Sequence, residues 1–196
     1  KYNDLAHRDA QIISDTIYDF DEKSINVSFT IREGKQYYIR KIEWSGNQKY
    51  STGLLDTVLG IQKGDLYNKS ILDTKLFMNP NGTDISSLYM DDGYLFFQIN
   101  PLETFVDSIN HINLEIQIKE GKQALIRNVK VEGNTKTNDR IIMREIRSLP
   151  GELFKRSDII RTQEEFNRLG FFNPESLGVN PLPDPETGNV DIYYSV

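Results

Sequence analysis

The sequence IREGKQ at residues 31–36 returns as IKEGKQ at residues 118–123, 87 residues later. The dipeptide Gly46-Asn47 returns with the same spacing as Gly133-Asn134. A sequence that repeats at a fixed period folds as a string of similar structural units, so the period is read before any single motif. The repeat therefore predicts at least two copies of one module.

Each copy has the pattern of an α/β unit. An opening strand with alternating apolar residues comes first, at 38–44 and 125–131, and the Gly-Asn turn follows it. A first helix is expected next, capped near Ser51 or Thr52 in one copy and near Thr137 or Asn138 in the other. A second helix is expected from Ser70 to Gly93 and from Ser157 to Gly170, because glycine suits the left-handed residue that ends a helix.

Two further strands close each copy. The last of them alternates strictly, so that one side chain in two points to the same face. The apolar positions are Ile25, Val27, Phe29 and Ile31, then Ile112, Leu114, Ile116 and Ile118, and finally Val190, Ile192, Tyr194 and Val196. The order β-α-α-β-β predicts an α+β module in which two helices cover one face of a three-stranded sheet.

The repeat also divides the chain. Residues 1–34 match only the last two strands of a module, residues 35–121 form a complete one, and residues 122–196 form a last one that stops just before its Glu-Gly pair. Gly93 returns as Gly170 after 77 residues instead of 87, so the complete module carries extra residues. They fall near 78–84, a turn-rich stretch that predicts a loop insertion.

Composition excludes several classes of function. The chain has 29 acidic and 23 basic residues and a net charge of −6, which argues against binding nucleic acid. It has no cysteine, and its two histidines, His7 and His111, stand in no metal-ligand pattern. Phosphate-binding loops and nucleophile elbows are absent as well. We therefore expect no metal, no cofactor and no enzyme activity.

Three further stretches carry a family resemblance. They are VEGNTKT at 131–137, REIR at 144–147 followed by Gly151, and NRLGFF at 167–172. Together with the repeat, they resemble POTRA modules, the periplasmic repeats that precede the membrane β-barrel of BamA-type outer-membrane assembly factors. The resemblance covers the whole chain and implies tandem modules with three-stranded mixed sheets, the last two of which are the penultimate and last modules before the barrel.

The resemblance also implies a function without chemistry. Such modules lie at the periplasmic face of the bacterial outer membrane, bind unfolded outer-membrane β-barrel precursors and accessory assembly lipoproteins, and guide protein insertion beside the C-terminal β-barrel of the same chain. The usual mode of binding is β-augmentation, in which an extended segment pairs with an open strand. An alternative is the POTRA region of a related two-partner secretion or translocation transporter. A third possibility is the accessory domain of an enzyme associated with the cell wall.

The first candidate partner-binding site is the second strand of the complete module, Leu95-Phe96-Phe97-Gln98-Ile99. By resemblance this strand lies at the edge of the sheet, where unpaired backbone groups attract another strand. It is apolar on both faces and has no charged residue to protect it. The alternative is structural: one face packs under the helices and the other against the neighbouring module.

The second candidate is the first helix of the last module, with Arg144, Glu145 and Arg147. In the family this region lies near the accessory lipoprotein. The alternative is a solvated helix face with weak local ion pairs. Arg40 and Arg127, which occupy equivalent strand positions, are expected to form structural salt bridges.

Overall fold

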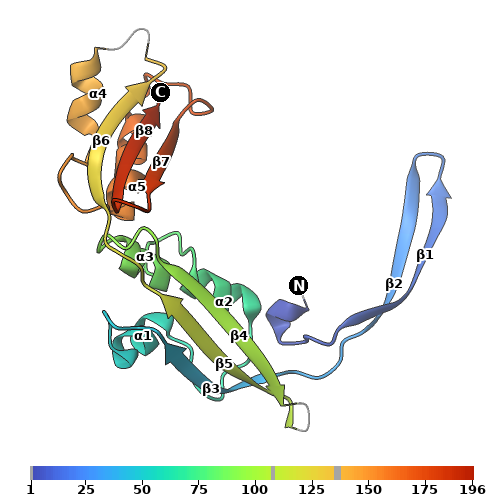
Figure 1. The fold of residues 1–196 in the computed structure, drawn as a ribbon. Helices are drawn as coiled ribbons and strands as arrows, with labels where there is room; N and C mark the ends of the chain where they lie inside the picture. Colours follow the sequence, from blue (N-terminus) through green and yellow to red (C-terminus); the bar gives the residue numbers. More distant parts are fainter. Residues whose placement is uncertain (1, 107–108, 135–137) are drawn as a thin grey trace.

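The computed structural model describes residues 2–106, 109–134 and 138–196, and its units follow one another along an arc (Figure 1). A two-stranded hairpin comes first, and two larger units with a three-stranded sheet each follow it. In both larger units the helices lie on one face of the sheet. The expected α+β class, with tandem modules built on three-stranded mixed sheets, is confirmed.

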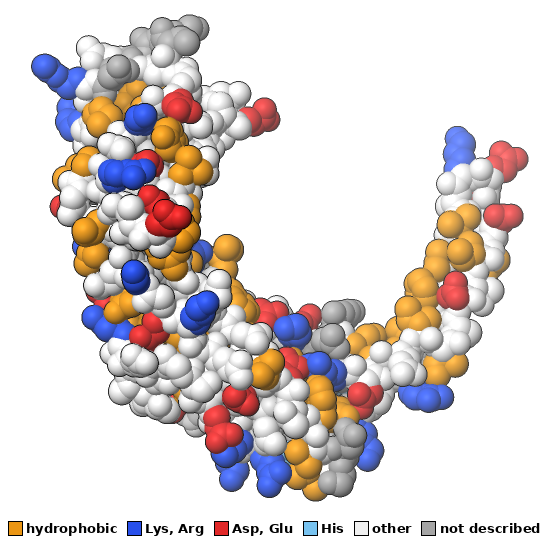
Figure 2. All heavy atoms as spheres, in the orientation of Figure 1, with side chains coloured by type: hydrophobic (Ala, Val, Ile, Leu, Met, Phe, Trp, Pro, Cys, Tyr) orange, Lys and Arg blue, Asp and Glu red, His pale blue; other side chains and the backbone are white. Residues whose placement is uncertain are grey.

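The first unit consists of a short 3-10 helix, η1 (Asn3–Leu5), and the strands β1 (Gln11–Asp21) and β2 (Ser24–Arg32). The two strands pair antiparallel, and their register gathers apolar side chains on one face of the hairpin. In the described part of the chain no helix covers this face, and Figure 2 shows apolar side chains along the hairpin. The exposed ones include Ile12, Ile17, Ile25, Val27 and Phe29.

The middle unit has three strands and three helices. They are β3 (Tyr38–Ser45), α1 (Thr52–Leu59), α2 (Lys69–Leu76), α3 (Ile85–Met90), β4 (Gln98–Val106) and β5 (His111–Lys119). The sheet order is β3-β5-β4, so that β5 lies in the centre, parallel to β3 and antiparallel to β4.

The last unit repeats this order with one helix fewer. Its elements are β6 (Leu125–Glu132), α4 (Asp139–Glu145), α5 (Arg156–Leu169), β7 (Gly178–Asp184) and β8 (Asn189–Ser195). The sheet order is β6-β8-β7, again with the last strand in the centre. Each central strand supplies the core from alternate positions, as predicted. Ile112, Leu114 and Ile116 are buried in the middle unit, and Val190, Ile192 and Tyr194 in the last one.

The 87-residue repeat of the sequence is also a repeat of main-chain hydrogen bonds. The Ile39 N–H donates to the Asp65 carbonyl at 2.8 Å, and the Ile126 N–H donates to the Glu152 carbonyl at 2.8 Å. In both units the loop before the second helix is thereby attached to the outer edge of the opening strand. The first half of β3 and of β6 is therefore covered by its own unit.

The first helix begins as predicted in both units. The Ser51 hydroxyl accepts a hydrogen bond from the Leu54 N–H in α1, and the Asn138 side chain accepts one from the Arg140 N–H in α4. Thr137, the other residue considered for the second cap, lies outside the described residues. A side-chain acceptor at this position satisfies one of the free N–H groups of the first helical turn.

The prediction of a single second helix from Ser70 to Gly93 is wrong. Helix α2 ends at Leu76, a loop follows, and Asp84 caps a separate helix α3 by accepting hydrogen bonds from the Ser87 N–H and hydroxyl at 2.9 and 2.7 Å. Proline and glycine in the loop break the helical run. In the last unit, which has no such insertion, α5 runs without interruption to Gly170, which adopts the left-handed conformation.

A β-bulge interrupts the opening strand of each unit at Arg40 and Arg127. Each arginine follows a buried isoleucine at an irregularity in the parallel pairing, so its side chain lies outside the core. Arg127 forms the predicted salt bridge, with Nη2 2.6 Å from an oxygen of Asp191, and its hydrogen bond lowers the pKa of Asp191 to about 2. Within the described residues Arg40 makes no ion pair, so the prediction is wrong there.

We expect opposite effects from alanine at two glycines of the middle unit. Gly46 has φ +81°, and a Cβ atom there would lie 2.0 Å from the Ile118 carbonyl oxygen, so Gly46→Ala should lower the free energy of unfolding by about 1–3 kcal/mol. Gly53 lies in α1 with no heavy atom within 4 Å of such a Cβ, so Gly53→Ala should raise it by up to about 1 kcal/mol.

Urea unfolding followed by the fluorescence of Trp44, the single tryptophan, measures both changes. Equal stability of the two variants would contradict this assignment of the Gly46 turn.

Candidate binding site at a sheet edge

The strand β4 has an open edge. It pairs with β5 along nine residues, and no other described strand pairs with it. The opening strand β3 is the opposite edge of the same sheet, but its first half is held by its own loop. An unpaired row of N–H and C=O groups can pair with an added strand. In the middle unit, β4 is therefore the longest stretch of backbone open to such pairing.

Pro101 fixes the direction in which the backbone groups of β4 point. It stands opposite Ile116 in the register, and because proline has no N–H, its nitrogen belongs on the side away from β5. Orientation alternates along a strand. Ile99, Glu103 and Phe105 therefore direct their backbone groups outward, whereas Gln98 faces β5.

The last unit has the equivalent edge strand, β7, which is a poorer template. Pro181 and Pro183 stand at alternate positions of its seven residues, so both nitrogens lie on the same side of the strand. That side is the open edge, since a proline nitrogen cannot pair with β8. Two backbone N–H donors are therefore missing from the open edge of β7. The edge of β4 is open to an added strand, whereas that of β7 is partly blocked.

The structure separates the five residues predicted as one strand. Gln98 and Ile99 lie in β4, but Leu95, Phe96 and Phe97 precede it, so their placement in the edge strand is wrong. Phe97 is 7% exposed and stacks on Tyr89, with ring centroids 4.3 Å apart. Leu95 and Phe96 pack against the core of the last unit. These three residues are all apolar because Phe97 packs in the core of the middle unit while Leu95 and Phe96 pack against that of the last unit.

A groove lies beside the start of β4, and we call it the junction groove. Its volume is about 470 Å³. It is lined by Phe77, Met78, Ser86, Met90, Phe97, Gln98, Ile99 and Arg156. Seven of these residues come from the middle unit, and Arg156 comes from the first turn of α5 in the last unit. The groove is thus mainly apolar and ends at a guanidinium group.

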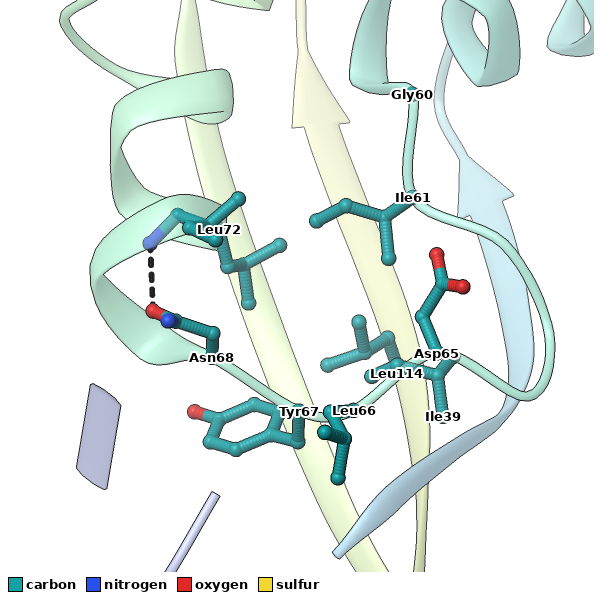
Figure 3. Close-up of a pocket in the computed structure, with 10 residues that line it drawn as sticks. Ile39, Gly60, Ile61, Asp65, Leu66, Tyr67, Asn68, Leu72 and Leu114 are labelled. Carbon is teal, nitrogen blue, oxygen red and sulfur yellow. Dashed lines mark hydrogen bonds between the residues drawn. The ribbon is translucent and has the colours of Figure 1, made fainter. Parts of the chain in front are cut away.

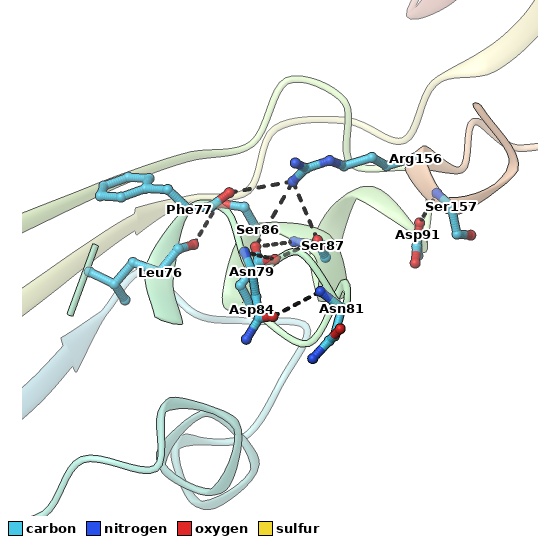
Figure 4. Close-up of polar contacts among 10 residues, drawn as sticks. All are labelled: Leu76, Phe77, Asn79, Asn81, Asp84, Ser86, Ser87, Asp91, Arg156 and Ser157. Carbon is cyan, nitrogen blue, oxygen red and sulfur yellow. Dashed lines mark hydrogen bonds and ion pairs between the residues drawn. The ribbon is translucent and has the colours of Figure 1, made fainter. Parts of the chain in front are cut away.

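Polar contacts hold the two units together at this groove (Figure 4). Arg156 Nη1 donates to the Phe77 carbonyl at 3.4 Å and to the Ser87 hydroxyl at 3.3 Å, and it lies 4.0 Å from a carboxylate oxygen of Asp84. The Asp84 side chain is fully buried. An arginine of one unit is therefore fixed by the inserted loop and the following helix of the other.

Helix α5 also takes its N-terminal cap from the neighbouring unit. Its own N-cap residue, Lys155, makes no side-chain capping bond, but the Ser157 N–H donates to Asp91 at 2.7 Å. A carboxylate at this position satisfies a free N–H group and interacts favourably with the helix dipole. Asp91 thus joins the two units.

The predicted second site lies on and after α4. The Arg144 side chain is 73% exposed, and its Nε donates to the Glu145 carboxylate at 2.9 Å. Arg147 lies two residues beyond the end of α4, and its backbone N–H donates to the Thr162 hydroxyl at 3.0 Å. Exposed apolar side chains, Ile141, Met143 and Leu149, lie close to these arginines in the sequence. The surface is therefore basic and partly apolar.

A pocket of about 320 Å³ lies under the loop between α1 and α2 (Figure 3). Ile39, Leu72 and Leu114 supply apolar walls. Its carboxylate, Asp65, accepts a hydrogen bond from the Gln62 N–H at 2.7 Å and so belongs to the turn. Across the described residues no three potential metal ligands come together, and no described helix is long and apolar enough to span a membrane.

Comparisons place these features among known proteins. The model of the family described as "POTRA: Surface antigen variable number repeat" matches residues 37–121 and 124–196. The outer membrane protein assembly factor BamA of Nitratidesulfovibrio vulgaris is 29% identical over 94% of this chain and 23% of its own length. BamA of Neisseria meningitidis is 26% identical over 88% of this chain and 23% of its own length. The chain thus spans about a quarter of these relatives.

Two solved structures have the same fold. The crystal structure of Haemophilus influenzae BamA POTRA3-5 aligns with a TM-score of 0.78 and 23% identity, over 98% of this chain and 74% of that one. BamA from Haemophilus ducreyi lacking POTRA domains 1–3 aligns with a TM-score of 0.66 and 22% identity, over 81% of this chain and 29% of that one.

We expect Asp91→Ala to destabilise α5, although the residue belongs to the other unit. Loss of the capping bond should cost about 1 kcal/mol. Asp91→Asn keeps a side-chain acceptor and should cost less. Amide hydrogen exchange of residues 157–169 measures the effect. Unchanged protection of α5 in Asp91→Ala would mean that the bond between the units does not stabilise the helix.

Proposed function

This chain belongs to the POTRA family, and we propose that it is the POTRA region of an outer-membrane protein assembly factor. It acts as a scaffold at the periplasmic face of the outer membrane, beside the C-terminal β-barrel of the same protein. Support comes from the names of the two relatives described above, both outer membrane protein assembly factors, and from the open edge of β4. We assign it no catalytic role.

The first task is to bind barrel precursors at β4. The observation that carries this proposal is the nine-residue strand with one unpaired edge and outward backbone groups at Ile99, Glu103 and Phe105. Main-chain hydrogen bonds recognise any extended segment, so they suit a scaffold that receives many different precursors. Because each such bond contributes only about 1 kcal/mol net, the complex is weak enough to release its ligand.

The second task is to dock an accessory lipoprotein at Arg144, Glu145 and Arg147. The two arginines are exposed, and the apolar side chains close to them in the sequence would add buried area to a contact. A partner of acidic surface complements this patch, and exposed charges of this kind mainly set the rate of association and its specificity. The buried Ile146, next to Arg147 in the chain, anchors the patch to the core.

Proline at two neighbouring positions of β4 tests the edge. Ile99→Pro removes an outward N–H and should weaken binding of a short peptide of alternating apolar and polar residues by about tenfold. Ile99→Ala keeps the N–H and should retain most of the affinity, although Ile99 packs against the core. Gln98→Pro should instead damage the sheet, because its N–H faces β5.

Chemical-shift changes on peptide titration are the readout. Strand addition at this module would be wrong if the shifting amides lay on a helix face and left residues 98–106 unchanged.

Charge reversal tests the lipoprotein surface. The double variant Arg144→Glu/Arg147→Glu should bind the accessory lipoprotein more weakly, while its stability stays within about 0.5 kcal/mol of the wild type, as is usual for surface changes. Arg168→Glu is the matched control, because Arg168 is similarly exposed but lies on α5. The affinities are measured by calorimetry. Equal affinities of the double variant and the wild type would mean that these residues form an ordinary solvated surface.

A further inference from the structure

The junction groove is shared between two modules, and this sets it apart from the rest of the β4 edge. Its lining includes Phe97, just before β4, and Ile99 within β4, and further apolar residues come from the end of α2 and from α3. The last module contributes one residue, Arg156, whose side chain is 21% exposed. A strand paired with the first residues of β4 would therefore place side chains beside a residue of the next module.

Arg156 is held in the groove by one long ion pair and two hydrogen bonds. Among the described residues its ion-pair partner is Asp84, with a carboxylate oxygen 4.0 Å from Nη1. The Asp84 oxygens already accept hydrogen bonds from the N–H groups of Asn79 and Ser87 and from the Ser87 hydroxyl, at 2.7–3.0 Å. The hydrogen bonds of Arg156 go to neutral oxygens through Nη1 alone. Within the described residues Nε and Nη2 make no hydrogen bond, so the guanidinium plane can still contact another group in the groove.

The lining favours an aromatic group over a carboxylate or an aliphatic chain. The walls are aromatic and thioether side chains: Met78 is 68% exposed, Phe77 is 38% exposed, and Met90 lies beside them. Thioether sulfur and aromatic edges make favourable contacts with rings. A guanidinium group stacks on an aromatic face, whereas a carboxylate would be desolvated among apolar side chains. A volume of about 470 Å³ is enough for one large ring.

We infer that the junction groove is a composite pocket for an aromatic side chain of the segment that adds to β4, with Arg156 of the following module as the residue that recognises the ring. The inference rests on the proposed peptide binding and names the class of ligand: an extended, aromatic-bearing stretch of unfolded polypeptide. Because the ligand then contacts both modules, its binding favours their docked arrangement, and the docked arrangement favours binding by the same factor.

Paired peptides test this on the whole chain. A set of short alternating peptides carries a single Phe at successive alternate positions, and a matched set carries Leu there. At the position that reaches the groove, the wild type should bind the Phe peptide about fivefold more tightly than its Leu twin. Binding of that Phe peptide should shift amides at the start of α5 as well as in β4.

Three variants isolate the arginine. Arg156→Gln should remove the preference for Phe while keeping the affinity for the Leu peptide, and Arg156→Lys should lose most of the preference because it keeps the charge without the planar group. Arg161→Gln, on the same helix but outside the groove, should keep the preference. Amide spectra verify that each variant is folded.

The outcomes separate the two proposals. Absence of any peptide binding at β4 would overturn the proposed function together with this inference. Binding at β4 with no preference for Phe, or with a preference that survives in Arg156→Gln, would overturn the composite pocket alone.

Discussion

The hydrogen bond from the Ala124 N–H to the Gly93 carbonyl, 2.8 Å long, is the contact on which the arrangement of the modules depends. It joins Gly93, three residues after α3, to Ala124, the residue before β6. The same bond occurs 87 residues earlier, from Tyr37 to Ala6 at 3.1 Å, and Ala6 shares the left-handed conformation of Gly93. A non-glycine residue pays strain in that conformation, which indicates that the junction requires it.

The side-chain contacts at this junction depend on this main-chain hydrogen bond. With the end of α3 held against the start of β6, Asp91 reaches the first turn of α5, and Arg156 reaches back to the inserted loop. Leu95 and Phe96 can then enter the core of the last unit without a longer linker. The first junction uses different side chains: Arg8 contacts Glu103 and lies over the Phe105 ring, 4.4 Å from its centroid. Both junctions contain the same main-chain hydrogen bond, and each adds its own set of side-chain contacts.

How far the sequence predicted these features depended on whether they repeat. The alternation in Ile112–Ile118 and Val190–Val196 predicted the central strand of each unit. Because the pattern occurs in both copies, each copy supported the prediction for the other. The break between α2 and α3 occurs in one copy only, so no second example corrected the expected helix. The bulges at Arg40 and Arg127 are present in both copies, yet a bulge leaves alternation apparently intact and only changes which residue points inward.

The site was harder to predict than the fold, for a physical reason. An apolar run such as Leu95-Phe96-Phe97 has the same composition whether it offers an open edge or fills the contact between two cores, and only the register of the following strand separates these cases. The better signal was Pro101, since a proline inside a nine-residue strand marks the side of the strand that faces no neighbour. Arg156 carried no signal of its own, because its role depends on a loop that its own module lacks.

The cap that Asp91 supplies to α5 gives the array an order of folding. A polypeptide made from its N-terminus completes the middle module first, and domains generally fold in that sequence. The finished module then presents a carboxylate, a backbone carbonyl and two apolar side chains at fixed positions, and the last module assembles on this template. Exchanging the two modules within the chain would leave α5 without its cap and Arg156 without its acceptors. Helix α5 therefore requires the middle module directly before its own module, and this requirement sets the order of the two modules.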